Sequence, residues 1–508
     1  MTTPAERFAA AKQRAAHAQS IFGQWSAQFP FELDDFQVRA CRSLEAGRGV
    51  LVAAPTGSGK TVVGEFALHL ALREGRRAFY TTPIKALSNQ KYRDLCERYD
   101  RDTVGLLTGD TVINGDAPIV VMTTEVVRNM LYDGSPAISS LSHVVMDEVH
   151  YLADRQRGAV WEEVILHLPE QVRIAALSAT VSNAEEFGAW LADVRGDTDV
   201  IVEERRPIPL HQHVLAGRNL VDLFAGDTEG VNPILIRMAQ DDARAARIGR
   251  TGAGPGRGGR GGRGQRGGAP GYQSRSSTLD RLAAAELLPA LLFVFSRRGC
   301  DEALVQTMRS GVRLTDDGER RRIRSHVDER CADLPRTDLA VLGYYEWREA
   351  LERGVAAHHA GMLPLFKEVV EELFTEGLTK AVFATETLAL GINMPARSVV
   401  LERLVKWNGQ THADITAGEY TQLTGRAGRR GIDVEGHAIT VWHHGLDPNA
   451  LAGLASTRTY PLKSSFQPSY NMAVNLVGRL GRRQARDLLE TSFAQYQADA
   501  GVVGLANQ

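Results

Sequence analysis

The chain has 508 residues, enough for roughly three domains with cores of their own. Apolar residues make up 43% and charged residues 24%, which is typical of a globular protein, and the net charge of −2 neither indicates nor excludes a nucleic-acid partner. The N-terminus lacks the apolar segment of a secretory signal, and no apolar run of about eighteen residues could span a bilayer. Four scattered cysteines without a C-x-x-C pair argue against a zinc site or a disulfide framework. We therefore expect a cytoplasmic protein without membrane contact.

The first strong pattern in chain order is an apolar run, Val50 to Ala54, that follows a short solvated helix predicted at residues 5–20. The run has no polar alternation, which is typical of a buried parallel strand. It breaks at Pro55, and a helical pattern opens at Lys60 and continues to a stop at Gly75. Strand, glycine-rich loop and helix therefore follow one another, as in phosphate-binding loops.

The loop between strand and helix matches G-x-x-x-x-G-K-[ST], except that alanine stands at the first glycine position. Glycines let backbone N–H groups turn toward a phosphate, and the helix N-terminus adds positive potential. The lysine is expected to reach the β- and γ-phosphates, and the final threonine to ligate Mg²⁺. The alternative is a glycine-rich turn without a ligand, which the strand and helix on either side disfavour. The predicted nucleotide-binding residues are Ala54, Pro55, Thr56, Gly57, Ser58, Gly59, Lys60 and Thr61.

Strands and helices continue to alternate as far as about residue 204, which predicts a parallel sheet with helices on both faces. Further strands are expected at 77–82, 119–123, 143–146 and 173–177. The strand at 143–146 leads directly into Asp147 and Glu148. Asp147 is expected to hold Mg²⁺, and Glu148 to orient and deprotonate an attacking water. An acidic pair alone is a weak signal, but it gains weight at a strand end after a phosphate loop.

The composition changes abruptly between Ala243 and Leu279, where Arg-Gly-Gly repeats occur without any acidic residue from 256 to 268. Such a segment cannot bury enough apolar area to offset its chain entropy, so we expect disorder. Arg-Gly repeats are also typical of RNA-contacting segments. A merely soluble linker explains the composition equally well, and both interpretations stay open.

A second alternating region predicts a second α/β domain, with strands near 290–295, 354–358, 380–384, 398–401 and 437–442. Residues 303–353 are charged and helical in pattern. Gln422 to Arg430 carries Arg426 and Arg429 on what we expect to be a helix, with no nearby carboxylate to neutralise them. Arginine fingers for a nucleotide site would account for such a pair, and an exposed basic helix end is the alternative. His358 and His359 are expected to be packed or backbone-bonded rather than metal ligands.

These motifs together resemble superfamily 2 helicases, and within them the DExH-box RNA helicases of the superkiller and exosome-cofactor type. Besides the phosphate loop and Asp-Glu-Val-His at 147–150, the matching stretches include 31–37, 82–91, 108–110, 123–125, 178–180, 384–393 and 422–430. The resemblance covers roughly residues 29–480. It implies two RecA-like domains in tandem, followed by the start of a winged-helix domain.

The resemblance also implies a role for each matching residue. Phe31 and Gln37 correspond to the adenine-recognition element, and Gly391 and Asn393 to further ATP contacts. Gln422, Arg426 and Arg429 would act with Lys60, Asp147 and Glu148 in catalysis, while Thr61 and Asp147 hold Mg²⁺. Coupling between the ATP site and the nucleic acid would run through His150, Ser178 and Thr180. The implied nucleic-acid contacts are Pro83, Lys85, Thr108, Gly109, Thr123, Thr124, Glu125 and Thr385.

We accordingly predict an N-terminal extension at 1–28, an ATP-binding RecA-like domain at 29–210 and a linker with the Arg-Gly segment at 211–285. A second RecA-like domain at 286–448 and a partial winged-helix region at 449–508 follow. The helical bundle and the arch of family members do not fit before Gln508, so we expect a truncated form or a stripped-down relative.

The predicted function is that of an ATP- and Mg²⁺-dependent translocase. It is expected to bind single-stranded RNA without sequence preference, move along it and unwind duplexes. The resemblance implies 3′ to 5′ movement and RNA-degradation partners. One alternative is a DNA translocase, which ATPase stimulation by the two polymers distinguishes. The other is an RNA-binding scaffold with a silenced motor, for which deleting 250–270 should abolish RNA binding while Lys60→Ala leaves function intact. A small-molecule kinase would not need the second domain's arginine pair.

Overall fold

The computed structural model describes residues 18–155, 157–226, 230–251, 274–389, 394–407, 411–457, 459–468 and 470–506. It divides into two compact units. Unit 1 comprises residues up to Arg205 together with those from Thr459 onward, and unit 2 comprises Arg206–Arg458. The predicted helix at 5–20 lies largely outside the described residues, as does most of the Arg-Gly segment.

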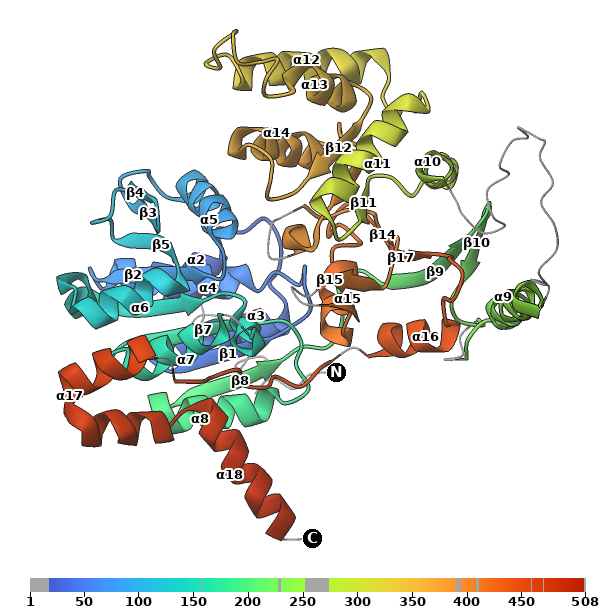
Figure 1. Ribbon diagram of the computed structural model, residues 1–508. Helices are drawn as coiled ribbons and strands as arrows, with labels where there is room; N and C mark the ends of the chain where they lie inside the picture. Colours follow the sequence, from blue (N-terminus) through green and yellow to red (C-terminus); the bar gives the residue numbers. More distant parts are fainter. Residues whose placement is uncertain are drawn as a thin grey trace, which may run out of the picture. The chain divides into compact units, whose positions relative to one another are not determined.

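Unit 1 is built on an eight-stranded sheet with the strand order β4-β3-β5-β2-β6-β7-β1-β8, parallel except for β4 (Figure 1). The predicted strands are all present, and the sequence pattern missed β3, β4 and β8. The strands are β1 (Gly49–Ala53), β2 (Arg77–Thr82), β3 (Val104–Thr108), β4 (Thr111–Ile113), β5 (Ile119–Thr123), β6 (Leu141–Met146), β7 (Arg173–Ser178) and β8 (Thr198–Val202).

Alternate residues of the central strands point to opposite faces of this sheet, so each strand feeds two cores. Val50 and Val52 of β1 pack with α2 to α5, whereas Leu51 and Ala53 pack with α6 to α8. The helices of unit 1 are α2 (Ile21–Ser26), α3 (Asp35–Glu45), α4 (Thr61–Arg73), α5 (Lys85–Arg98), α6 (Thr124–Asp133), α7 (Gly158–His167), α8 (Ala184–Arg195), α17 (Tyr470–Glu490), α18 (Phe493–Ala506) and the 3-10 turns η1 (Pro136–Ser140) and η2 (Val149–Ala153).

Unit 2 contains a seven-stranded sheet with the order β10-β9-β17-β14-β11-β13-β12. Its strands are β9 (Leu210–Ala216), β10 (Asn219–Asp222), β11 (Ala290–Phe293), β12 (Val355–His358), β13 (Ala381–Ala384), β14 (Ser398–Leu401) and β17 (Gly436–Val441), with a separate hairpin of β15 (Val405–Trp407) and β16 (His412–Asp414). Its helices are α9 (Pro233–Thr251), α10 (Arg275–Ala284), α11 (Arg297–Arg309), α12 (Asp317–Arg330), α13 (Tyr344–Glu352), α14 (Pro364–Thr375), α15 (Ala417–Thr424), α16 (Pro448–Ser456) and the 3-10 turn η3 (Glu386–Ala389).

Three of the predicted domain boundaries differ from the structure. The predicted extension ends inside unit 1, because Phe22 and Trp25 of α2 are buried in its core. The predicted linker from 211 begins inside a sheet, because β9 pairs in parallel with β17 and places Leu215 in the core of unit 2. The predicted C-terminal region at 449–508 is divided, since α16 belongs to unit 2 and the chain from Thr459 packs on unit 1.

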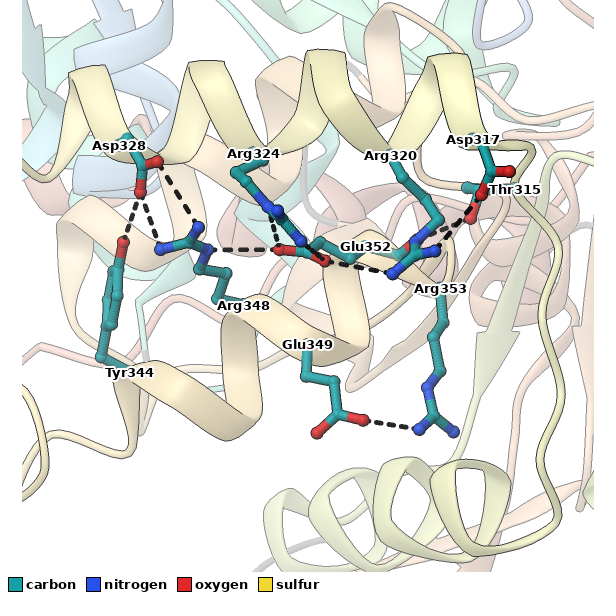
Figure 2. Close-up of polar contacts among 10 residues, drawn as sticks. All are labelled: Thr315, Asp317, Arg320, Arg324, Asp328, Tyr344, Arg348, Glu349, Glu352 and Arg353. Carbon is teal, nitrogen blue, oxygen red and sulfur yellow. Dashed lines mark hydrogen bonds and ion pairs between the residues drawn. The ribbon is translucent and has the colours of Figure 1, made fainter.

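The charged region at 303–353 forms the second half of α11 and the helices α12 and α13. Helices α12 and α13 pack against each other through ion pairs (Figure 2). The Glu352 carboxylate lies between Arg324 and Arg348, at 2.8 Å from Arg324 Nη2 and 3.3 Å from Arg348 Nε. Arg348 also pairs with Asp328, at 2.8 Å. Each of these arginines therefore has a carboxylate of the same helix pair as its partner.

Candidate nucleotide site and strand-contact edge

The phosphate loop leaves β1 at its carboxyl end and leads into α4. Gly57 and Gly59 have φ values of 81° and 85°, in the left-handed region that favours glycine. The Lys60 ammonium donates hydrogen bonds to Ala54 O at 2.7 Å and to Pro55 O at 3.1 Å. The lysine thus spans the loop that it belongs to, and the N-terminal turn of α4 follows it directly. This is the arrangement of a phosphate-binding cradle.

Gln37 is a buried residue of α3 whose side chain connects this helix to the phosphate loop. Its carbonyl oxygen accepts a hydrogen bond from Asp34 N at 2.9 Å, and its amide donates to Gly59 O at 2.9 Å. Phe31 lies 5.4 Å from Phe29 between ring centroids and leaves 52% of its surface exposed, as a ring that stacks on a base requires. The adenine contacts of both residues stay predictions.

Asp147 and Glu148 follow β6 at the same edge of the sheet. The Asp147 carboxylate accepts a hydrogen bond from the Tyr80 hydroxyl at 2.8 Å, and Asp147 N donates to Thr81 O at 3.0 Å. Burial raises the pKa of Asp147, aided by the Glu148 charge, while the nearby Lys91 and Lys60 charges act to lower it. Lys60 and Asp147 are thus brought within electrostatic range, although they lie far apart in the sequence.

His150 connects the loop after β6 with the loop after β7. Its Nδ1 accepts a hydrogen bond from Ala179 N at 3.2 Å. Burial lowers the pKa of His150 to about 3, so the ring is neutral. The 3.3 Å contact between Nδ1 and Glu148 Oε2 is therefore not an ion pair. Of the three predicted coupling residues, His150 directly joins the Asp-Glu-Val-His and Ser-Ala-Thr motifs, while Ser178 ends β7 and Thr180 lies in the loop after it.

The predicted nucleic-acid contacts of unit 1 gather at the carboxyl ends of β2, β3 and β5, which are neighbours in the sheet. Thr124 Oγ1 donates to Thr82 O at 3.3 Å, and Lys85 pairs with Asp110 at 2.7 Å. Lys85 and Asp110 keep 45% and 67% of their side chains exposed, so a phosphate can compete for the lysine. Pro83, Thr108, Gly109, Thr123 and Glu125 lie at the same strand ends.

The order of strands in unit 1 thus separates the nucleotide motifs from the predicted nucleic-acid contacts, although both lie at the carboxyl ends of the strands. The strands β6, β7 and β1 carry the nucleotide motifs, and β3, β5 and β2 carry the predicted strand contacts. Carboxyl ends of parallel strands are the usual place for ligands in α/β folds.

In unit 2, Thr385 directly follows β13, and its hydroxyl lies 2.9 Å from that of Thr387. The expectation of a helix around Arg426 and Arg429 is wrong, because α15 ends at Thr424. The expectation of no neighbouring carboxylate is also wrong, since Arg429 forms a two-point ion pair with Asp433, at 2.7 and 2.8 Å. Arg426 is buried, and Gln422 lies on α15. Gly391 and Asn393 lie outside the described residues.

His358 ends β12 and His359 follows it, and each has a carboxylate partner, Glu371 and Asp301 respectively, at 2.9 Å. His359 Nδ1 also accepts a hydrogen bond from Gly361 N at 3.1 Å. Within the described part of the chain, no three His, Cys, Asp or Glu side chains form a cluster able to hold a metal ion. The structure also describes no helix long and apolar enough to cross a membrane.

The oxygen donors around the phosphate loop nevertheless fit Mg²⁺, which usually binds through one or two carboxylates plus substrate phosphates. Asp147 supplies a buried carboxylate. Thr61 is the first residue of α4, and its hydroxyl oxygen lies 3.3 Å from Lys91 Nζ. The sequence patterns assigned no role to Tyr80 or Lys91. The one sequence signal for Tyr80 is that a tyrosine in a buried strand needs a hydrogen-bond partner for its hydroxyl.

Comparison with known proteins agrees with this geometry. Residues 34–187 match the DEAD/DEAH box helicase family, and residues 333–431 match the helicase conserved C-terminal domain. The chain is 63% identical over 491 residues to the probable helicase HelY of Mycobacterium tuberculosis strain H37Rv, covering 95% of this chain and 53% of HelY.

Two eukaryotic relatives are also similar over most of the chain. The DExH-box ATP-dependent RNA helicase DExH15, chloroplastic, of Arabidopsis thaliana is 39% identical over 524 residues, covering 92% of this chain and 43% of that protein. The human exosome RNA helicase MTR4 is 36% identical over 495 residues, covering 96% of this chain and 46% of MTR4. The chain spans about half the length of these curated relatives. With its two helicase domains and its Asp-Glu-Val-His motif, it belongs to the superfamily 2 DExH-box helicases of the superkiller and exosome-cofactor type.

Proposed function

We propose that the chain is an ATP-driven motor that moves 3′ to 5′ along single-stranded RNA, without sequence preference, and unwinds duplexes. The observation that carries the proposal is the convergence of Lys60, Asp147 and Glu148 at one edge of the unit 1 sheet, with His150 joining this site to the loop after β7. The relatives DExH15 and MTR4 are both named RNA helicases, which supports RNA as the polymer. The exosome named with MTR4 supports an RNA-degrading assembly as the partner.

Each side chain has a defined task in this proposal. Lys60 leaves the loop carbonyls for the β- and γ-phosphates, while Asp147 and Thr61 would hold Mg²⁺, which supplies charge neutralisation when it is bound. Glu148 accepts a proton from the attacking water. Arg426 and Arg429 stabilise the negative charge that develops on the transferred phosphoryl group. Arg429 also forms an ion pair with Asp433. Its task therefore requires either that this ion pair holds the guanidinium in position or that the ion pair breaks and releases the guanidinium.

Steady-state ATP hydrolysis with single-stranded RNA, single-stranded DNA and no polymer tests the proposal. We expect stronger stimulation by RNA than by DNA. Stronger stimulation by DNA than by RNA would show that RNA is not the preferred substrate. RNA binding without any ATP hydrolysis would favour the alternative of an RNA-binding scaffold with a silenced motor.

The variant Glu148→Gln should bind ATP but hydrolyse it roughly 10²–10⁴-fold more slowly, because the proton acceptor is lost. Arg426→Ala should lower kcat more than it weakens ATP binding, by about 10³-fold or more if the guanidinium acts as a finger. Near-normal turnover in Glu148→Gln, or a pure affinity effect in Arg426→Ala, would contradict the assigned tasks.

A further inference from the structure

A segment near the C-terminus of the described chain lies on unit 1 next to both motif-bearing loops. We call residues 459–466 the strap. Leu462 of the strap is fully buried in the core of unit 1, together with Leu152, Val181 and Phe187. Residues more than 270 positions apart in the sequence therefore share one core. This segment lies in the predicted partial winged-helix region at 449–508, and none of its residues was predicted to have a task in ATP hydrolysis.

The strap pairs first with the loop that follows the Ser-Ala-Thr motif. Tyr460 forms a parallel bridge with Val181, and Tyr460 O accepts a hydrogen bond from Ser182 N at 3.0 Å. The Asn183 side chain then holds Leu462 at both backbone groups. Its oxygen accepts from Leu462 N at 2.6 Å, and its amide donates to Leu462 O at 2.9 Å. Asn183 thus replaces a strand neighbour for this residue of the strap.

The strap then reaches the turn that follows the Asp-Glu-Val-His motif. Ser465 Oγ lies 2.8 Å from Leu152 O and 2.7 Å from Asp154 O, so one hydroxyl proton is shared between two carbonyls at the end of η2. Gly158 leaves the space for this contact. A Cβ atom there would lie 2.2 Å from Ser465 Oγ and 2.1 Å from Leu152 O.

The two motif loops are therefore joined at two places. Near the motifs, His150 accepts the hydrogen bond from Ala179 N. Farther along both loops, the strap bonds to Ser182 and Asn183 on one side and to Leu152 and Asp154 on the other. Glu162 of α7 accepts hydrogen bonds from the Ser464 hydroxyl and from Phe493 N at the start of α18, which extends the connection to the C-terminal helices.

We propose that Ser465 and Asn183 are positioning residues for ATP hydrolysis. They act through the strap, which keeps the loops after the Asp-Glu-Val-His and Ser-Ala-Thr motifs in register with each other. The proposal rests on the ATP-driven function proposed above. Because the contacts lie at the end of η2 and in the loop after the Ser-Ala-Thr motif, their loss displaces Glu148 and His150 without removing any group that touches ATP.

The first test is the steady-state kinetics of Ser465→Ala and Asn183→Ala in the full chain. We expect kcat to fall about 5- to 50-fold while KM for ATP changes less than about twofold, since the phosphate loop is untouched. Ser465→Thr, which keeps the hydroxyl, should restore most of the rate. Lys463→Ala is the matched control, because Lys463 is an exposed residue of the same strap. Rates of Ser465→Ala equal to those of Lys463→Ala would overturn the proposal.

The second test does not depend on hydrolysis, so failure of the proposed function can be distinguished from failure of the strap. Hydrogen exchange without nucleotide should rise about tenfold or more at Ser182 N and Asp154 N in Ser465→Ala, with β1 amides unchanged. Unchanged exchange at both amides would overturn the positioning role even if the wild-type chain hydrolyses ATP. If exchange rises in the variant but the wild-type chain does not hydrolyse ATP, the strap does connect the two loops, but its proposed role in ATP hydrolysis is wrong.

Discussion

Two buried glutamates, one in each unit, meet opposite surroundings. Glu162 of unit 1 receives hydrogen bonds from the Ser464 hydroxyl and from Phe493 N, and burial raises its pKa to about 7. Glu352 of unit 2 lies among Arg320, Arg324 and Arg348. Hydrogen bonds from Arg324 are the main cause that lowers its pKa (Figure 2).

The comparison shows that the partners of a buried carboxylate, rather than burial alone, decide its charge. Neutral donors stabilise Glu162 too weakly to offset its desolvation, whereas guanidinium groups more than offset that of Glu352. It also shows why the arginine-rich helices α12 and α13 need not bind nucleic acid. The arginines around Glu352 and Asp328 already have carboxylates of the same helix pair as their partners.

The largest effect should come from removing the carboxylate that three arginines share. Glu352→Ala should destabilise unit 2 by about 2–3 kcal/mol. This lies below the full cost of breaking a buried pair, because Arg324 keeps 51% of its side chain exposed. Hydrogen exchange of α12 and α13 across a urea series measures the loss, and a loss below about 1 kcal/mol would mean that the ion pairs contribute little.

The next effect is an opposite pH dependence of two matched variants, Glu162→Gln and Glu352→Gln. The folded pKa of Glu162 lies above its ordinary value of 4.5, so its stabilising contribution is full below pH 4.5 and is lost as the pH rises toward 7. The folded pKa of Glu352 is lowered, so its contribution is present above pH 4.5 and is lost as the pH falls through the folded pKa.

The cost of Glu162→Gln should therefore shrink by about 1–3 kcal/mol between pH 4.5 and 8, while that of Glu352→Gln should grow as the pH rises from acid to 4.5. Exchange of the α18 and α13 amides, corrected for intrinsic rates, measures both. Parallel slopes for the two variants would contradict the assigned charges.

A smaller loss is expected when one arginine of the cluster is removed. Arg324→Ala should cost about half as much as Glu352→Ala or less, because Arg348 still pairs with the carboxylate. Arg320→Ala should cost less again, since its Nη2 lies 3.6 Å from Glu352 Oε2. The same exchange measurement ranks the three variants, and an Arg320→Ala loss equal to that of Glu352→Ala would break the ranking.

The smallest effect is expected for an ion pair in solvent. Arg298 and Glu302 pair at 2.7 Å on α11, with 88% and 53% of their side chains exposed. Arg298→Ala should change the stability of unit 2 by no more than about 0.5 kcal/mol. A larger loss would show that exposure is a poor guide to the contribution of these ion pairs.

Strong apolar patterns were sufficient to predict several local elements from the sequence. The strands at 77–82, 119–123 and 398–401 were predicted with their observed bounds, because their residues are apolar enough to be buried on both faces. The sequence also predicted the phosphate loop and the Asp147–Glu148 pair, since each is encoded within a few neighbouring residues. The family resemblance follows from those motifs and agrees with the matched helicase domains.

Features that depend on contacts between distant residues could be recognised only in the folded chain. The half-polar strand β9 is recognisable only through its pairing with β17, and the Tyr80 hydroxyl gains its role only from the neighbouring strand β6. The two-point pair of Arg429 with Asp433 depends on the end of α15, which the sequence pattern placed too late. The strap is the clearest case, because the sequence assigned Ser465 only to the predicted winged-helix region, and its contacts with Leu152 and Asp154 arise only in the folded chain.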